Sequence, residues 1–136
     1  MNRDICASLQ EAVRSAQVKE GHTLAIIGGG SKNFLQSATA DAELHLSGHR
    51  GVLDYQPSEL FITARAGTPL AEIEAMLADH KQMLACEPPH FGNTATLGGV
   101  VACGFSGPRR PFAGSLRDHI LGVCILNGTG ELLQFG

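Results

Sequence analysis

Three consecutive glycines directly behind a short apolar run constrain this chain more than any other feature. Residues 23–27 are predicted to form a buried strand, and Gly28-Gly29-Gly30-Ser31-Lys32-Asn33 follow at once. Glycine allows positive φ and a close approach to a ligand, and successive N–H groups in such a turn can converge on an anion. Ser31 and Asn33 add side-chain donors. The segment therefore favours a phosphate-binding loop, with a glycine-rich turn that binds nothing as the alternative.

Two well-known phosphate loops are excluded by spacing. A P-loop needs Gly-Lys followed by Ser or Thr, whereas Lys32 follows Ser31 and precedes Asn33. A Rossmann loop needs Gly or Ala where Asn33 stands, followed by a helix that the next residues do not predict.

A second glycine cluster occupies residues 96–115. It contains Thr96-Leu97-Gly98-Gly99, a run of small residues over 100–104, Ser106-Gly107 and Gly114-Ser115. Small residues let a flat ligand lie against the backbone, whose N–H groups can bond to it; tight backbone packing without a ligand is the alternative. The whole stretch 86–115 is long for an irregular loop, and such loops are usually functional. Only residues 100–103 are predicted to form a helical turn there.

The remaining pattern predicts a mixed α+β fold. A helix is expected over 4–19 with Asp4 as its cap, and a second helix with Thr68 as cap and Pro69 at its first position. Leu70, Ile73 and Leu77 form the apolar stripe of the second helix. Strands are expected over 43–46, 52–55 and 60–66, and a hairpin over 120–126 and 131–135.

Composition excludes several classes of function. The net charge of -3 gives no reason to expect nucleic acid or an acidic membrane surface. No apolar run reaches the roughly 20 residues that cross a bilayer. The N-terminus lacks signal-peptide features, so a cytoplasmic protein is expected. The chain ends at Gly136 directly after a hairpin strand, which suggests a truncated protein.

No metal site and no catalytic side chain are predicted. The cysteines lack metal-ligand spacing and are expected to be buried small residues: Cys6, Cys86, Cys103 and Cys124. His45 and His49 have the spacing of a zinc pair, but they flank Ser47-Gly48, which is not helical. No nucleophile–base pair and no paired carboxylates can be placed together.

The two glycine clusters, in this order, resemble the FAD-binding domain of the vanillyl-alcohol-oxidase-like (PCMH-type) flavoproteins. The motifs that carry the likeness are 27–33, 52–55, 63–70, 96–99 and 114–122. Residues 86–92 (CEPPHFG) and 101–112 (VACGFSGPRRPF) are similar to the FAD-binding E subunits of bacterial glycolate oxidases.

This resemblance implies two small α/β subdomains with FAD between them, the first over about 1–67 and the start of the second over about 68–136. The strands that complete such a domain are expected to be missing. No flavin-linking histidine stands in the first loop, so FAD is expected without a covalent bond. The residues implied to bind FAD are Ile27, Gly28, Gly29, Gly30, Ser31, Lys32, Asn33, Pro88, Thr96, Leu97, Gly98, Gly99, Ser106, Gly107, Gly114, Ser115 and Asp118.

The resemblance also implies a function. Such an E subunit works beside a catalytic D-type flavin subunit and an iron–sulfur F-type subunit, and the complex oxidises glycolate or another 2-hydroxy acid. Membrane contact would come only through these partners, and this chain alone is expected to be inactive. The alternative is an assembly module that holds little flavin and docks, or self-associates, through an open sheet edge.

Other polar residues leave alternatives open. Arg109-Arg110 suits an anion or partner contact, or simply a solvated loop. His90 is either a flavin contact or a loop residue. Glu72, Glu74 and Asp79 are expected on the wet face of the second helix.

Overall fold

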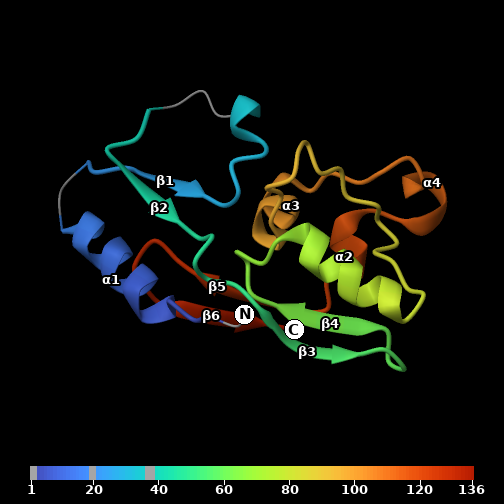
Figure 1. Cartoon of the computed structure of the whole chain (residues 1–136). Helices are drawn as coiled ribbons and strands as arrows, with labels where there is room; N and C mark the ends of the chain where they lie inside the picture. Colours follow the sequence, from blue (N-terminus) through green and yellow to red (C-terminus); the bar gives the residue numbers. More distant parts are fainter. Residues whose placement is uncertain (1–2, 19–20, 36–38) are drawn as a thin grey trace.

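The computed structural model describes residues 3–18, 21–35 and 39–136, and it has the mixed α+β architecture that the sequence predicts (Figure 1). The elements follow in the order α1 (Cys6–Gln17), β1 (Leu24–Ile27), η1 (Asn33–Leu35), β2 (Ala42–His45), β3 (Val52–Gln56), β4 (Phe61–Ala64), α2 (Leu70–Asp79), α3 (Leu97–Cys103), α4 (Arg110–Ala113), η2 (Leu116–His119), β5 (Val123–Leu126) and β6 (Leu132–Phe135). Here η marks a 3-10 helix.

The strands form three two-stranded sheets in the described part of the chain. β1 pairs with β2 in parallel, while β3–β4 and β5–β6 are antiparallel. The predicted hairpin is confirmed, with Leu126 opposite Leu132 across its turn. The prediction of a buried first strand is wrong: Ile26 is 63% exposed and the other β1 residues are only half-buried.

The core lies between α2, α3 and η2. Leu70, Ile73 and Leu77 are buried as the stripe predicts, and burial of each such side chain contributes about 1.5–3 kcal/mol. The backbone fixes the two helices together, because the N–H of Leu70 donates to the carbonyl of Ala95 at 2.8 Å. One buried cluster joins the three elements: Leu70, Cys86, Ala95, Val100 and Leu116.

The predicted cap of α2 is wrong by one position. Pro69 is the N-cap, and no side chain caps the helix. Thr68 is fully buried, and its hydroxyl is used elsewhere: it accepts from the N–H of Gly51 at 2.9 Å and lies 3.3 Å from the carbonyl oxygen of the same residue. The side chain therefore ties α2 to the start of β3.

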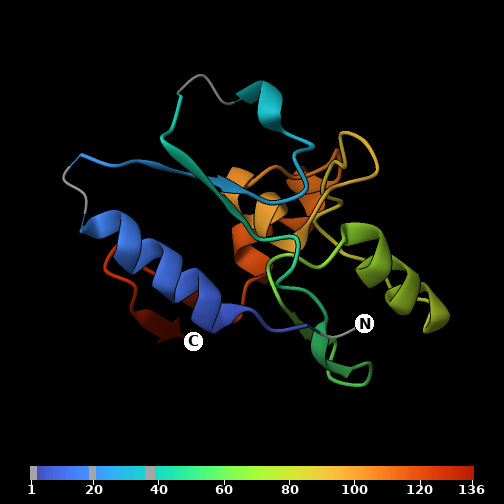
Figure 2. The ribbon, with the colours of Figure 1, turned by 60° about the vertical axis from the view of Figure 1, so that its left-hand side comes forward.

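Helix α1 lies beside the β5–β6 hairpin (Figure 2). The side chains of Gln10 and Arg14 both donate to the carbonyl of Gly130 in the hairpin turn, each at 3.1 Å. Ile5 is the N-cap, but Asp4 still accepts from the N–H of Cys6 at 2.9 Å, so its capping role is kept one position earlier. The predicted end of this helix, residue 19, lies outside the described residues.

Two further expectations are corrected. Residues 86–115 hold a second short helix, α4, because Pro111 fits the first turn of a helix, where its missing N–H costs nothing. Of the four cysteines only Cys86 is buried, whereas Cys124 is exposed. In the part of the chain that the structure describes, no helix is both long and apolar enough to span a membrane.

The buried hydroxyl of Thr68 gives a direct test of this architecture. Thr68→Val is expected to lower the free energy of unfolding by about 1–3 kcal/mol, because the Gly51 N–H is left buried without its acceptor. Thr63→Val, the same change at an exposed position of β4, is the control and should stay within about 0.5 kcal/mol. Urea unfolding measures both; equal effects would contradict the role given to Thr68.

Candidate functional site

The first glycine loop follows β1 and presents free backbone donors. Gly30 has a φ of 72°, which turns the chain before η1 begins at Asn33. In the described part of the chain, no acceptor is found for the N–H groups of Gly29, Gly30, Ser31 and Lys32. Consecutive unpaired N–H groups in a turn form a concave site for an anion.

This loop touches the segment before α3, and glycine makes the contact possible. A Cβ on Gly29 would overlap the carbonyl of Thr94, and one on Gly28 would lie 2.7 Å from Oγ1 of Thr96. The two glycine clusters, about 65 residues apart in sequence, therefore meet at the end of β1.

Lys32 brings a positive charge to the loop. The residue is only 9% exposed, and its Nζ donates to Oγ of Ser31 at 3.4 Å. Across the described ranges no carboxylate lies within ion-pair distance of it. A buried ammonium that lacks a counter-ion is costly, so the loop suits an anionic group.

The second cluster differs, because the chain itself occupies the backbone donors of its Leu97-Gly98-Gly99 motif. The N–H of Leu97 donates to Thr68 O at 2.9 Å, and that of Gly98 to Ala66 O at 2.7 Å. The N–H of Gly99 donates to the capping hydroxyl of Thr96 at 3.3 Å. These three N–H groups therefore already have acceptors within the chain, and a ligand that approaches Gly98 or Gly99 meets their small surface.

Gly107 and Gly114 likewise serve the chain. The N–H of Gly107 donates to Cys86 O at 2.8 Å, and a Cβ there would meet Glu87 O at 2.5 Å. The N–H of Gly114 donates to Arg110 O at 3.0 Å, and its φ is 89°. Close packing and positive φ thus explain these two glycines without a ligand.

Ser115 and Asp118 form a reciprocal cap at η2. The Asp118 carboxylate accepts from the Ser115 hydroxyl at 2.6 Å and from its N–H at 2.8 Å. These bonds, helped by the neighbouring Arg117, hold the pKa of Asp118 below its usual range. Oγ of Ser106 accepts from the N–H of Leu116 at 3.0 Å, so it braces the same turn.

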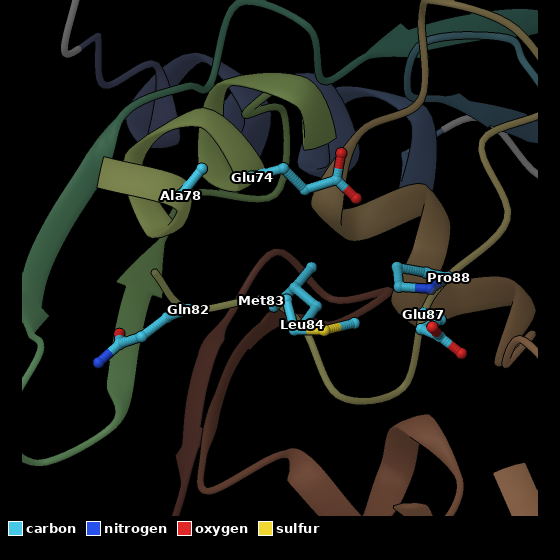
Figure 3. Close-up of a pocket in the computed structure, with 7 residues that line it drawn as sticks. All are labelled: Glu74, Ala78, Gln82, Met83, Leu84, Glu87 and Pro88. Atoms are coloured by element: carbon cyan, nitrogen blue, oxygen red, sulfur yellow. The ribbon is translucent and has the colours of Figure 1, made fainter. Parts of the chain in front are cut away.

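Two clefts flank these elements. One of about 530 Å³ includes the predicted residues Gly114, Ser115 and Asp118, together with Arg110 and Arg117. The other, of about 340 Å³, lies between α2 and the segment after it (Figure 3). Glu74 and Ala78 line it from α2, and Pro88 is its one predicted site residue.

The polar residues left open have specific places. His90 pairs with Glu74, with Nε2 2.9 Å from Oε2, and Arg50 pairs with Glu72 at 2.6 Å. On α2, Asp79 is exposed as expected, and the side chains of Glu72 and Glu74 remain 30% and 39% exposed beside their partners. Both arginines of the 109–110 pair are exposed, and Nη1 of Arg109 lies 3.6 Å from Sδ of Met83.

The structure thus groups the predicted residues unevenly. The first loop and residues 96–99 lie together, whereas Ser106, Gly114, Ser115 and Asp118 surround η2, and Pro88 lies in the other cleft. Sequence analysis missed the carbonyl of Thr94, since nothing in the residue type marks a backbone contact. It also missed Phe91, whose ring lies 5.8 Å from the Lys32 ammonium; an aromatic residue beside a glycine was the only signal.

Comparison with known proteins gives the family context. The profile of the family described as FAD binding domain matches residues 6–136. Glycolate oxidase subunit GlcE of Escherichia coli (strain K12) is 50% identical over 133 residues, which cover 98% of this chain and 38% of that protein. D-2-hydroxyglutarate dehydrogenase of Pseudomonas putida is 33% identical over 129 residues, or 94% of this chain and 12% of that protein. The chain therefore spans well under half the length of these relatives.

The fold also matches a solved structure. The crystal structure of Phl p 4, a grass pollen allergen with glucose dehydrogenase activity, superposes with a TM-score of 0.79 at 17% identity. The match covers 99% of this chain and 28% of Phl p 4. At this identity the likeness concerns the fold alone, and the expected PCMH-type fold is confirmed.

The Asp118 carboxyl provides a test of the local geometry. Carboxyl NMR should give a pKa for Asp118 below its ordinary value of about 3.9. Ser115→Ala should raise this pKa more than Arg117→Gln does, because the bonds from Ser115 are the larger cause.

The same shift sets a pH dependence. Because the pKa of Asp118 is lower in the folded chain, its stabilising contribution is present above the unfolded pKa and is lost as pH falls through the folded pKa. An Asp118 pKa unmoved by Ser115→Ala would contradict the cap.

Proposed function

This chain belongs to the FAD binding domain family, and from that premise we propose that it is the flavin-holding part of a glycolate or 2-hydroxy-acid oxidoreductase complex. The family assignment confirms the resemblance seen in the sequence, and with it FAD as the cofactor. The single observation that carries the proposal is the set of unpaired N–H groups over Gly29–Lys32, beside a buried ammonium.

The residues present fit a dinucleotide at this loop. Its pyrophosphate carries negative charge and many acceptor oxygens, which the free N–H groups and Lys32 would bind. When bound, FAD supplies the electron-accepting ring that side chains of this chain lack. The chain's own task is to bind, orient and neutralise: the loop donates hydrogen bonds, and Thr96 keeps the α3 segment in place behind it.

Several finer assignments are part of the proposal. FAD would lie, without a covalent bond, between subdomains over about 1–67 and 68–136; the buried cluster formed wholly by residues 70–116 supports a separate second unit. The whole protein would work with a D-type flavin subunit and an iron–sulfur F-type subunit, as the likeness to a glycolate oxidase subunit suggests. It would act in the cytoplasm and reach a membrane only through those partners; cell fractionation tests that location.

Assembly is the second candidate function, and one observation favours it. The β5–β6 hairpin pairs with no other strand in the described chain, and it exposes large apolar side chains, among them Ile125, Leu132 and Phe135. An unpaired edge with exposed apolar residues invites another chain. This candidate needs no flavin and adds a docking surface to the fold.

Flavin binding is tested with two glycines of matched conformation. Gly30 and Gly21 have φ values of 72° and 74°, and neither would bring a Cβ against backbone. Gly30→Ala and Gly21→Ala should therefore cost similar stability, about 1–2 kcal/mol each. Only Gly30→Ala should weaken FAD binding, by roughly tenfold (about 1.4 kcal/mol), because only this substitution distorts the first glycine loop. Flavin fluorescence titration gives the dissociation constants; an equal loss for both variants would remove the loop from the site.

Self-association is tested at the hairpin. Sedimentation over a wide concentration range should show dimers that Leu132→Lys abolishes, because a charge on an edge strand blocks pairing. Val18→Lys, at an 86% exposed position at the end of α1, is the control and should leave association unchanged. A chain that stays monomeric throughout the range would exclude this second candidate.

A further inference from the structure

Three phenylalanine rings lie in sequence beside the first glycine loop, with the ring of Phe91 in contact with the other two. The centroids of Phe34 and Phe91 are 5.3 Å apart, with ring planes at 61°. Those of Phe91 and Phe105 are 5.9 Å apart, with planes at 59°. Phe34 belongs to η1, Phe91 to the stretch between α2 and α3, and Phe105 follows α3. We call these three residues the aromatic row.

The aromatic row is exposed, although its rings touch. Phe34 is 65% exposed, Phe91 48% and Phe105 37%. A single exposed aromatic residue is ordinary, but rings from three separate segments that gather on one surface form a contiguous apolar patch, and such patches mark binding sites. The edge-to-face arrangement leaves ring surface open for a further flat group.

A buried positive charge adjoins this patch. Nζ of Lys32 lies 5.8 Å from the centroid of Phe91, and among the described residues its hydrogen-bond partner is Oγ of Ser31, at a long 3.4 Å. The free N–H groups of Gly29 to Lys32 stand on the same loop. Apolar ring surface and anion-binding groups therefore lie side by side.

We propose that the aromatic row stacks one ring system of a dinucleotide while Lys32 neutralises the phosphate next to that ring. This inference rests on the proposed function and adds residues to it. A dinucleotide combines the two chemistries that the surface offers, because a flat ring and a phosphate are joined by a short sugar linker. Base–aromatic stacking tolerates any flat ring, so adenine and flavin share the chemistry required.

The test measures FAD dissociation constants of the full chain at several salt concentrations. Phe34→Leu should weaken binding roughly tenfold and leave the salt dependence unchanged, since it removes stacking surface alone. Lys32→Gln should weaken binding and also flatten the salt dependence, since it removes the positive charge that pairs with the phosphate. Phe34→Tyr keeps a ring and should bind as the unaltered chain does.

Phe112→Leu is the matched control, because Phe112 is 92% exposed and lies outside the aromatic row. It should bind FAD unchanged. If Phe34→Leu alters the circular dichroism spectrum, Phe105→Leu takes its place. A Phe34→Leu variant that binds like Phe112→Leu overturns the inference and leaves the proposed function standing, whereas an unaltered chain that binds no FAD overturns both.

Competition identifies the ring. If the aromatic row stacks adenine, Phe34→Leu should weaken the binding of ADP and leave the binding of FMN unchanged. If the row stacks the flavin ring, Phe34→Leu should weaken the binding of FMN and leave that of ADP unchanged. A variant that weakens neither ligand contradicts stacking at this surface.

Discussion

The contact between Gly29 and the carbonyl of Thr94 is the constraint on which the site depends. Any side chain at residue 29 would overlap that carbonyl, so only glycine lets the loop after β1 reach the segment that leads into α3. The same approach seats Gly28 against the hydroxyl of Thr96, which caps α3. α3 in turn packs with α2 through Val100 and Leu70 in one buried cluster. The position of the first glycine loop is therefore fixed by its packing against the core. Hydrogen bonds from the loop's own N–H groups are not needed to hold it in place.

The two glycine clusters have different physical roles. In the first, glycines free the backbone N–H groups over Gly29–Lys32 for an anion. In the second, the N–H groups of Gly98, Gly99 and Gly107 are bound within the chain, and the lack of side chains permits close packing. This division fits a flavin dinucleotide, because the charged pyrophosphate needs donors while a flat ring needs open surface.

Local sequence patterns predicted the helices and strands well, because each of these elements depends mainly on residues that are close in sequence. The apolar stripe of Leu70, Ile73 and Leu77 and the C-terminal hairpin are both confirmed. Thr68 was assigned the wrong role, because its true partner, Gly51, is 17 residues away and no local rule selects it. The order of the glycine motifs led to the proposed site, yet residue type alone could not tell which N–H groups the chain already uses. The contact of Lys32 with Phe91 also depends on tertiary structure.

Backbone amide NMR during titration with FAD tests the central claim most directly. The account predicts that the amide signals of Gly29, Gly30, Ser31 and Lys32 shift most, because their N–H groups are the free donors, and that inorganic pyrophosphate shifts the same signals. The amides of Gly98 and Gly107, which are bound within the chain, should move less. Shifts centred on Gly98 and Gly107, with the first loop unchanged, would contradict the account.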